Sequence, residues 1–145
     1  MVSIREANKN DVSDLAFLMK ELGFPTTIEK MELRFNHIQS NSNYHTLVAE
    51  ENSKIIGMIG LFTGLLYNKD GIYCRVISFV VDSKIRNKGV GNLLIQEAEK
   101  WAKNQGAIYI GLNSGNQLDR LDAHEFYKRS GYKADSTGFV KTLCN

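Results

Sequence analysis

The sequence predicts a single α/β domain in which helices flank a mixed, mostly antiparallel central sheet. Apolar runs rich in β-branched residues alternate with stretches whose apolar residues have helical spacing. Apolar residues make up 43% of the 145 positions, which is enough for one substantial core. No repeat, low-complexity segment or linker divides the chain. We therefore expect one domain over residues 1–145, with the element order β-α-α-β-β-β-α-β-α-β-β.

The first expected elements are a strand over residues 2–6 and two helices. Asn10 can cap the first helix, whose apolar residues recur at i, i+3 and i+4 until Gly23 breaks the pattern. The sequence Thr-Thr-Ile-Glu at residues 26–29 has the form of a capping box. It predicts a second helix that runs to about Gln39.

Three strands are expected next. Apolar residues dominate positions 44–50 and 55–66, and the polar residues 51–54 lie between them. This arrangement predicts a hairpin. A second polar turn at residues 68–71 then leads into an expected strand over residues 73–81.

The C-terminal part is expected to alternate helices and strands. An amphipathic helix is predicted over residues 89–105, a strand over 107–113 and a last helix over 121–130. Two closing strands are expected at residues 132–135 and 138–143. The predicted buried stripe of the first of these helices consists of Leu93, Leu94, Ala98, Trp101 and Ala102.

The composition argues against several classes of protein. The net charge is +2 and no long Lys/Arg run occurs, so we expect no nucleic-acid partner. No run approaches about 18 apolar residues and residues 1–11 lack the apolar core of a signal peptide, so we expect no membrane partner. Cys74 and Cys144 do not make a disulfide scaffold, and the histidines and cysteines lack metal-ligand spacing. We therefore expect a cytoplasmic protein with reduced thiols and no metal.

The segment that says most about function is a strand followed by a short loop and the start of a helix. Gly89 and Gly91 lack side chains that would keep a ligand from the backbone, and Arg86 and Lys88 add positive charge. A helix start attracts anions, so this segment is suited to a phosphate group. Its glycines could also simply begin a helix. A Rossmann motif is excluded because Leu94 stands where it needs a third glycine, and no Walker A sequence occurs.

Two segments resemble the signatures of a known superfamily. Residues 80–91 read Val-Val-Asp followed by Arg-x-x-Gly-x-Gly, which resembles the acetyl-CoA motif of the GNAT superfamily of N-acetyltransferases. Residues 120–132 read Arg-x-x-Ala-His-x-Phe-Tyr-x-x-x-Gly-Tyr and resemble its second signature. Residues 120–132, together with residues 57–61 and 139–143, are also similar to the subgroup that includes aminoalkylphosphonate N-acetyltransferases.

This resemblance implies that acetyl-CoA is the co-substrate. The loop over residues 86–91 would bind the CoA pyrophosphate, while backbone groups of Phe79 and Val81 would pair with the pantetheine arm. The small side chain of Ala123 would leave room for the cofactor. The residues implied to contact acetyl-CoA are Phe79, Val80, Val81, Arg86, Asn87, Lys88, Gly89, Val90, Gly91, Ala123, Phe126 and Tyr127.

The resemblance also implies roles in catalysis. Tyr127 matches the tyrosine that protonates the departing thiolate in relatives, although it could be a core aromatic. Ser78 stands where many relatives have a glutamate, and a hydroxyl is not a base near neutral pH. His124 and His45 are the alternative bases, and His45 could be only a strand residue. The residues expected to contact the acceptor are Phe24, Ser78, Asn113 and Arg120.

The sequence therefore predicts direct acetyl transfer to a primary amine of a small molecule. Acetylation of a protein amine is the alternative within this class. A CoA-binding regulatory module without turnover is the alternative outside it, supported by the missing strand carboxylate. No nucleophile triad includes either cysteine, which disfavours a covalent enzyme intermediate. Dimerisation is common in the superfamily, so a homodimer is allowed by the resemblance.

Overall fold

The computed structural model describes residues 1–85, 88–114 and 121–144. The chain forms two compact units, residues 1–110 and residues 111–145. The first contains the sheet and three α-helices, and the second contains one helix and the C-terminal segment. The predicted α/β class is confirmed, while a single functional domain over the whole chain stays a prediction.

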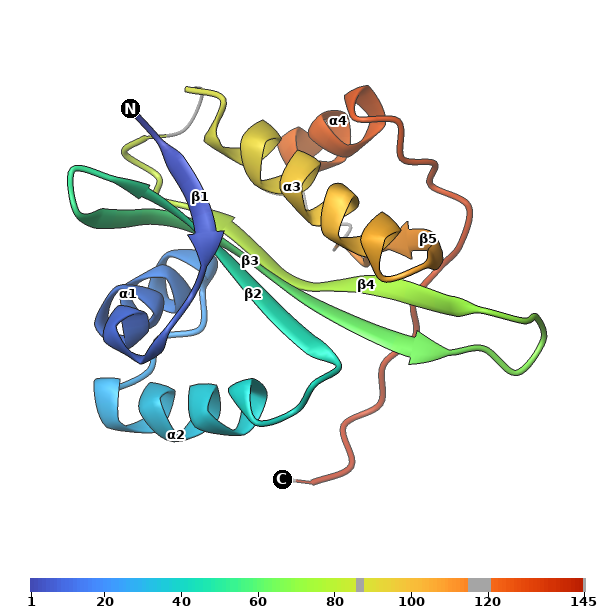
Figure 1. The fold of residues 1–145 in the computed structure, drawn as a ribbon, viewed down its shortest axis with the longest axis horizontal. Coiled ribbons are helices and arrows are strands. Elements are labelled where there is room, and N and C mark those ends of the chain that lie inside the picture. Colours follow the sequence, from blue (N-terminus) through green and yellow to red (C-terminus); the bar gives the residue numbers. More distant parts are fainter. Residues whose placement is uncertain (86–87, 115–120, 145) are drawn as a thin grey trace. The chain divides into compact units, whose positions relative to one another are not determined.

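The sheet has five strands in the spatial order β1-β2-β3-β4-β5 (Figure 1). The strands β1 to β4 are antiparallel to their neighbours. The hairpin between β2 and β3 closes through Asn52 and Ser53, whose φ angles of 53° and 65° are those of a type I′ turn. The strands span Ser3–Glu6 (β1), Tyr44–Glu51 (β2), Lys54–Leu65 (β3), Ile72–Val81 (β4) and Ala107–Gly111 (β5).

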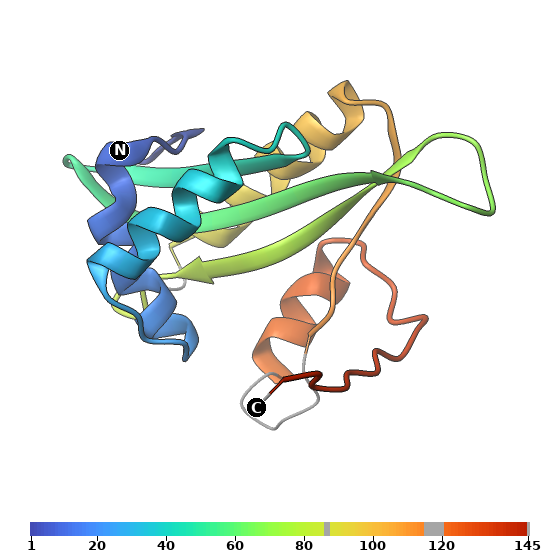
Figure 2. The same cartoon turned by 90° about the horizontal axis from the view of Figure 1, so that it is seen from below.

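Helices cover both faces of this sheet in the first unit (Figures 1 and 2). Met58 and Val80 are register partners on β3 and β4, and both belong to the core formed with α1 and α2. One residue earlier on β3, an added Cβ at Gly57 would lie 3.1 Å from Leu94 Cδ1 of α3. Alternate residues of β3 therefore face opposite helix layers. The helices span Val12–Leu22 (α1), Ile28–Gln39 (α2) and Val90–Asn104 (α3).

The helix starts differ from the sequence prediction in detail. A short 3₁₀-helix, η1 (Lys9–Asp11), precedes α1, and Asn8 rather than Asn10 is its cap. The Asn8 side chain accepts a hydrogen bond from the Asn10 N–H (2.8 Å), and the Asp11 carboxylate accepts one from the Asn8 N–H (2.8 Å). Asp11 is buried and pairs with the Arg5 guanidinium (2.8 Å), which lowers the pKa of Asp11. At α2 the cap is Thr27, whose hydroxyl accepts the N–H of Lys30 (3.1 Å).

The predicted stripe of α3 is partly wrong. Leu93 is 40% exposed, whereas Ile95 is 1% exposed. Trp101 is half-buried rather than buried. The remaining predicted members, Leu94, Ala98 and Ala102, are buried. The centre of the buried face therefore lies roughly 30°, or about one tenth of a turn, from the predicted centre, because Val90 and Ile95 belong to it.

The two predicted closing strands are absent from the structure. The second unit contains α4 (Leu121–Arg129), and no strand forms over residues 132–144. The apolar residues Phe139, Val140 and Leu143 are each more than nine-tenths exposed. Strand propensity alone does not make a strand, because the backbone N–H and C=O groups of a strand need hydrogen-bond partners on a neighbouring strand. The described part of residues 112–144 contains no strand.

Candidate active site

The chain leaves β4 through a tightly bonded turn at Asp82. Its backbone N–H donates to the Ile56 carbonyl (2.8 Å), which continues the β-type bonding past the end of the strand. Its carboxylate accepts from the Lys84 N–H (3.1 Å), and its carbonyl accepts from the Ile85 N–H (2.9 Å). Asp82 is 2% exposed. This aspartate of the first signature therefore shapes the turn that leads into the expected phosphate loop.

A second anchor comes from α1. Glu21 Oε1 accepts two hydrogen bonds from Ser83, one from its backbone N–H (3.0 Å) and one from its hydroxyl (2.6 Å). These contacts tie the C-terminal end of α1 to the first residues after Asp82. Glu21 could not be predicted from the sequence, because a glutamate on the polar side of a helix gives no signal for a partner so distant in the chain.

The start of α3 has the backbone form expected of an anion site. Gly89 is its N-cap, with φ +80° and ψ 6°, a conformation that favours glycine. A Cβ added there would meet nothing within 4 Å, so the space beside the backbone is open. The first N–H groups of a helix have no partner within it and carry its positive dipole end. The side chain of Val90 is buried, so only its backbone can face a ligand, and Lys88 is exposed.

Two of the predicted loop residues, Arg86 and Asn87, lie outside the described residues. Lys88, Gly89, Val90 and Gly91 lie together where the loop enters α3. The described part of this segment fits a phosphate-bearing ligand by its open glycine and its helix start.

The strand β4 carries a bulge beside the predicted site. Gly60 of β3 pairs with Ser78, but the next β3 residue pairs with Val76, so Ile77 is an extra residue on β4. Ile77 is 50% exposed. Bulges redirect a strand locally and are frequent beside active sites. This one changes the direction of β4 immediately before Ser78.

The register also sorts the predicted residues by face. Ser78 and Val80 pair with Gly60 and Met58, which places them on the sheet face covered by α1 and α2. Val80 is 5% exposed and belongs to the core, so only its backbone could contact acetyl-CoA. Phe79 falls between them in the strand and faces the α3 side, as does Val81.

His45 lies on the α3 side of the sheet. Its register partner on β3 is Leu61, the neighbour of Gly60, so His45 and Ser78 face opposite sides. The imidazole stacks on Trp101 with ring centroids 4.5 Å apart and an interplanar angle of 3°. Its Nδ1 is 3.0 Å from Glu6 Oε2. Burial lowers the pKa of His45, against the opposing charge of Glu6. These contacts support the packing interpretation of His45.

The second signature forms the end of α4 in the other unit. Gly131 has φ +93°, and the Tyr132 N–H donates to the Tyr127 carbonyl (2.9 Å), which is the bond of a Schellman cap. The rings of Tyr127 and Tyr132 have centroids 6.0 Å apart. Part of this signature therefore ends the helix and fixes the Tyr127 backbone. The four predicted site residues on α4 are all partly buried: Ala123, His124, Phe126 and Tyr127.

The remaining predicted acceptor residues are Phe24, Asn113 and Arg120. Phe24 is 66% exposed in the loop between α1 and α2, and its N–H bonds the Met19 carbonyl (2.8 Å) at the end of α1. Asn113 is exposed after β5, in the second unit. Arg120 lies outside the described residues. The structure thus places Ser78 on a defined sheet face and Phe24 in an exposed loop of the same unit, while Asn113 belongs to the other unit.

Both cysteines are free thiols. Cys74 is fully buried on β4, and burial raises its pKa to about 11. Cys144 is exposed. A buried thiol of this kind is inert, so Cys74 is not suited to nucleophilic catalysis.

The described residues contain neither a cluster of metal ligands nor a helix able to cross a membrane. Over residues 1–85, 88–114 and 121–144, no group of three or more His, Cys, Asp or Glu side chains could hold a metal ion. Among the helices of that same part of the chain, none is both long and apolar enough to cross a membrane.

Comparisons with known proteins agree with the two signatures. The model of the acetyltransferase (GNAT) family matches residues 12–132. The chain is 30% identical over 127 residues to an uncharacterized N-acetyltransferase of Bacillus subtilis, YhdJ, with 87% of each protein covered. It is 32% identical over 101 residues to the aminoalkylphosphonate N-acetyltransferase of Salmonella typhimurium, covering 70% of this chain and 64% of that protein.

A solved structure extends the likeness to the fold. The crystal structure of a GNAT family acetyltransferase from Staphylococcus aureus superposes with a TM-score of 0.85 at 31% identity, over 98% of each chain.

Proposed function

Since this chain belongs to the GNAT acetyltransferase family and is an N-acetyltransferase, we propose that it transfers the acetyl group of acetyl-CoA to the primary amine of a small molecule. The proposal is supported mainly by the connection between β4 and α3. There Glu21 and Asp82 anchor the turn, and Gly89 leaves open space at a helix start. Backbone N–H groups at that point suit the pyrophosphate of CoA.

The chemistry requires a neutral amine and a protonated leaving group. The amine nitrogen attacks the acetyl carbonyl carbon, a C–N bond forms and the C–S bond breaks. Tyr127 then acts as general acid and gives its phenolic proton to the departing thiolate. The amine loses one proton, which passes to a base or to water. A backbone N–H of the β4 segment after the bulge would bond the carbonyl oxygen as its negative charge grows.

The base is proposed to be water or a histidine. Ser78 occupies the α1 and α2 face of β4, where its hydroxyl could hold a water molecule near the amine. His124 on α4 is the histidine candidate. His45 is the weaker candidate because its ring lies against Trp101 on the opposite side of the sheet.

A small-molecule acceptor is favoured over a protein amine by one comparison. The Salmonella typhimurium relative is named for aminoalkylphosphonates, which are small amines. A CoA-binding module without turnover is the candidate from another class, and Ser78 in place of a carboxylate is its support. We include in the proposal a cytoplasmic location, no required metal and the possibility of a homodimer.

A single-turnover experiment separates these candidates. Protein in excess over acetyl-CoA is mixed with a panel of small amines or with lysine-containing peptides, and free thiol and acetylated product are measured together. Equal amounts of thiol and acetylated small amine are expected. Product only with peptides would establish the protein-amine alternative. CoA binding without any product would establish the non-catalytic module.

A further inference from the structure

A pair of stacked rings joins the C-terminal half of α3 to the sheet. The imidazole of His45 on β2 lies parallel to the indole of Trp101 on α3, with ring centroids 4.5 Å apart and an interplanar angle of 3°. The His45 side chain is 18% exposed, and its Nδ1 is 3.0 Å from Glu6 Oε2 on β1. Two strands and the helix α3 therefore meet at one group that can gain a proton near neutral pH.

On the strands, Glu6 is the charged group that faces the imidazole. Its neighbour Arg5 pairs with Val48, which belongs to the core shared with α1 and α2, so Arg5 faces the opposite side of the sheet. On β3 the register partner of His45 is the buried Leu61, which carries no charge. Glu6 is therefore the one charge from β1, β2 or β3 in contact with the imidazole among the described residues.

The charged residues of α3 near Trp101 are occupied or turned away. Glu97, one turn before Trp101, pairs with Lys100 (3.2 Å). Glu99 and Lys103 are each two positions from Trp101, and residues at that spacing do not share a helix face. Besides burial, the charge of Glu6 alone therefore acts on the pKa of the imidazole.

A positive charge on His45 is disfavoured in this position. Burial removes water from the imidazolium and lowers the pKa of His45, against the opposing charge of Glu6. The Glu6 side chain is 67% exposed, so water screens its attraction and it does not offset the loss of hydration. Acid therefore favours an arrangement in which the imidazole regains water. Trp101 is only half-buried, so the stack is the contact that can open.

The same helix carries the proposed phosphate site at its other end. Trp101 follows the N-cap Gly89 by about 18 Å of helix, at 1.5 Å per residue. Between them Leu94 and Ala98 are fully buried, so α3 stays on the sheet when the stack opens. Release of the C-terminal end then allows α3 to tilt about these contacts. A tilt moves the N–H groups at the helix start relative to the anchored turn at Asp82.

Resting on the function proposed above, we propose that protonation of His45 opens its stack on Trp101, loosens the C-terminal end of α3 and thereby weakens CoA binding. The protein then holds CoA at neutral and alkaline pH and releases it more readily below about pH 6.5, the ordinary pKa of histidine. The coupling is reciprocal, so bound CoA favours the closed stack and lowers the pH at which the stack opens.

Trp101 is the only tryptophan of the chain, so its fluorescence reports the stack directly. Emission of the intact protein is recorded from about pH 8 to pH 4.5 for the parent, His45→Phe and Glu6→Gln. The parent should show a step with a midpoint below about pH 6.5, and His45→Phe, which keeps a ring but takes no proton, should show none. In Glu6→Gln the step should move to lower pH, because the charge that favours the imidazolium is gone. Circular dichroism at each pH checks that the protein stays folded.

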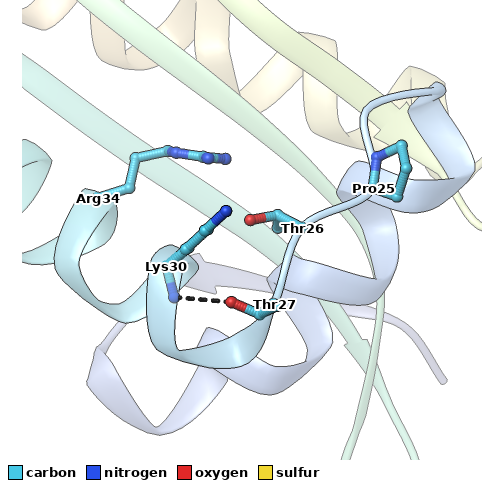
Figure 3. A pocket seen from close by; sticks show the side chains of 5 residues that line it. All are labelled: Pro25, Thr26, Thr27, Lys30 and Arg34. Atoms are coloured by element: carbon cyan, nitrogen blue, oxygen red, sulfur yellow. Dashed lines mark hydrogen bonds between the residues drawn. The ribbon is translucent and has the colours of Figure 1, made fainter.

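A second histidine supplies the matched control. The helix α2 packs on the opposite face of the sheet, where Thr27 caps its first turn (Figure 3). His37 lies near the other end of α2 and is exposed. His37→Gln therefore removes an imidazole on the other side of the sheet, and its fluorescence step should match that of the parent.

Calorimetry then tests the coupling to CoA. The phosphate groups of CoA themselves titrate near about pH 6, so the parent is compared with His45→Phe at both ends of the pH range. Allosteric coupling is usually about 5- to 150-fold, and at its lower end the parent should lose about 5-fold more affinity in acid than His45→Phe does. By reciprocity, saturation with CoA should lower the midpoint of the parent fluorescence step by about 0.7 pH units.

Four results would contradict the proposal or the function on which it rests. A parent midpoint above about pH 6.5 would mean that the charge strengthens the stack, and a step that persists in His45→Phe would mean that another group titrates; either overturns the proposal. A midpoint that does not move when CoA binds would show that the stack has no effect on the start of α3, which overturns the regulation. A normal fluorescence step without CoA binding at any pH would support the proton-sensitive stack and contradict the proposed acetyl transfer.

Discussion

Removal of the Glu21 carboxylate should weaken CoA binding without unfolding the protein. Its two hydrogen bonds to Ser83 hold the beginning of the proposed phosphate loop. A hydrogen bond to a charged group contributes roughly 1.5–3 kcal/mol when buried, but Ser83 is exposed and solvent screens the contact. We therefore assign about 1 kcal/mol to each bond, or about 2 kcal/mol to the pair. If the loop must be ordered for binding, Glu21→Ala should raise the Kd for CoA by up to about 30-fold.

Calorimetric titration of CoA into four variants measures this effect. Ser83→Ala removes the hydroxyl but keeps the backbone N–H, so it should cost about half as much as Glu21→Ala. The double variant should be no weaker than Glu21→Ala, because both changes break the same contact. Glu32→Ala, at an exposed position of α2, controls for the loss of a negative charge. If Glu21→Ala and Glu32→Ala bind CoA equally well, the anchor does not order the loop and the reasoning is wrong.

Three other changes test separate parts of the account. Gly89→Val puts a β-branched side chain at φ +80° and into the open space beside the backbone, so CoA affinity should fall more than about 10-fold while the protein stays folded. An unchanged Kd for CoA, measured by calorimetry, would refute this. Tyr127→Phe should lower kcat by about 10²–10⁴-fold with little change in acetyl-CoA affinity, and a loss of only a few-fold under rate-limiting chemistry would make Tyr127 a packing residue. Burial lowers the pKa of His45 in the folded protein. The neutral imidazole therefore contributes its full stabilisation above the pKa of the unfolded chain, about 6.5, and this stabilisation is lost as pH falls through the lower pKa of the folded protein. Thermal melting between pH 8 and pH 5 should therefore show a smaller loss of stability in His45→Phe than in the parent, and parallel curves would contradict the assignment.

Local sequence patterns predicted most of the first unit. The β2–β3 hairpin follows from two apolar runs around a polar turn, and α3 follows from its helical spacing up to Gly106. Helix caps were harder, because Asn8 and Asn10 are both good caps and only the contact with Asp11 selects Asn8. The stripe of α3 was shifted because Leu93 and Ile95 are equally apolar, and only the packed sheet decides which one is buried.

Features that depend on distant contacts could not be predicted in this way. The apolar residues at 139–143 have the composition of a strand, but the structure gives them no strand neighbour. Glu21 and Ser83 are 62 positions apart, and neither belongs to a motif. The site residues on β4 and on α4, by contrast, could be predicted, because residues 80–91 and 120–132 resemble two signatures of the family. The glycines of these signatures begin α3 and end α4.

The central claim is that this chain moves an acetyl group from acetyl-CoA to a small amine. The most direct measurement is mass spectrometry of a reaction that contains the protein, acetyl-CoA labelled with ¹³C in the acetyl group, and a panel of small primary amines. The account predicts an amine product that carries the labelled acetyl group, released together with an equal amount of free CoA. Release of labelled acetate alone, or no release of CoA although calorimetry shows that acetyl-CoA binds, would contradict it.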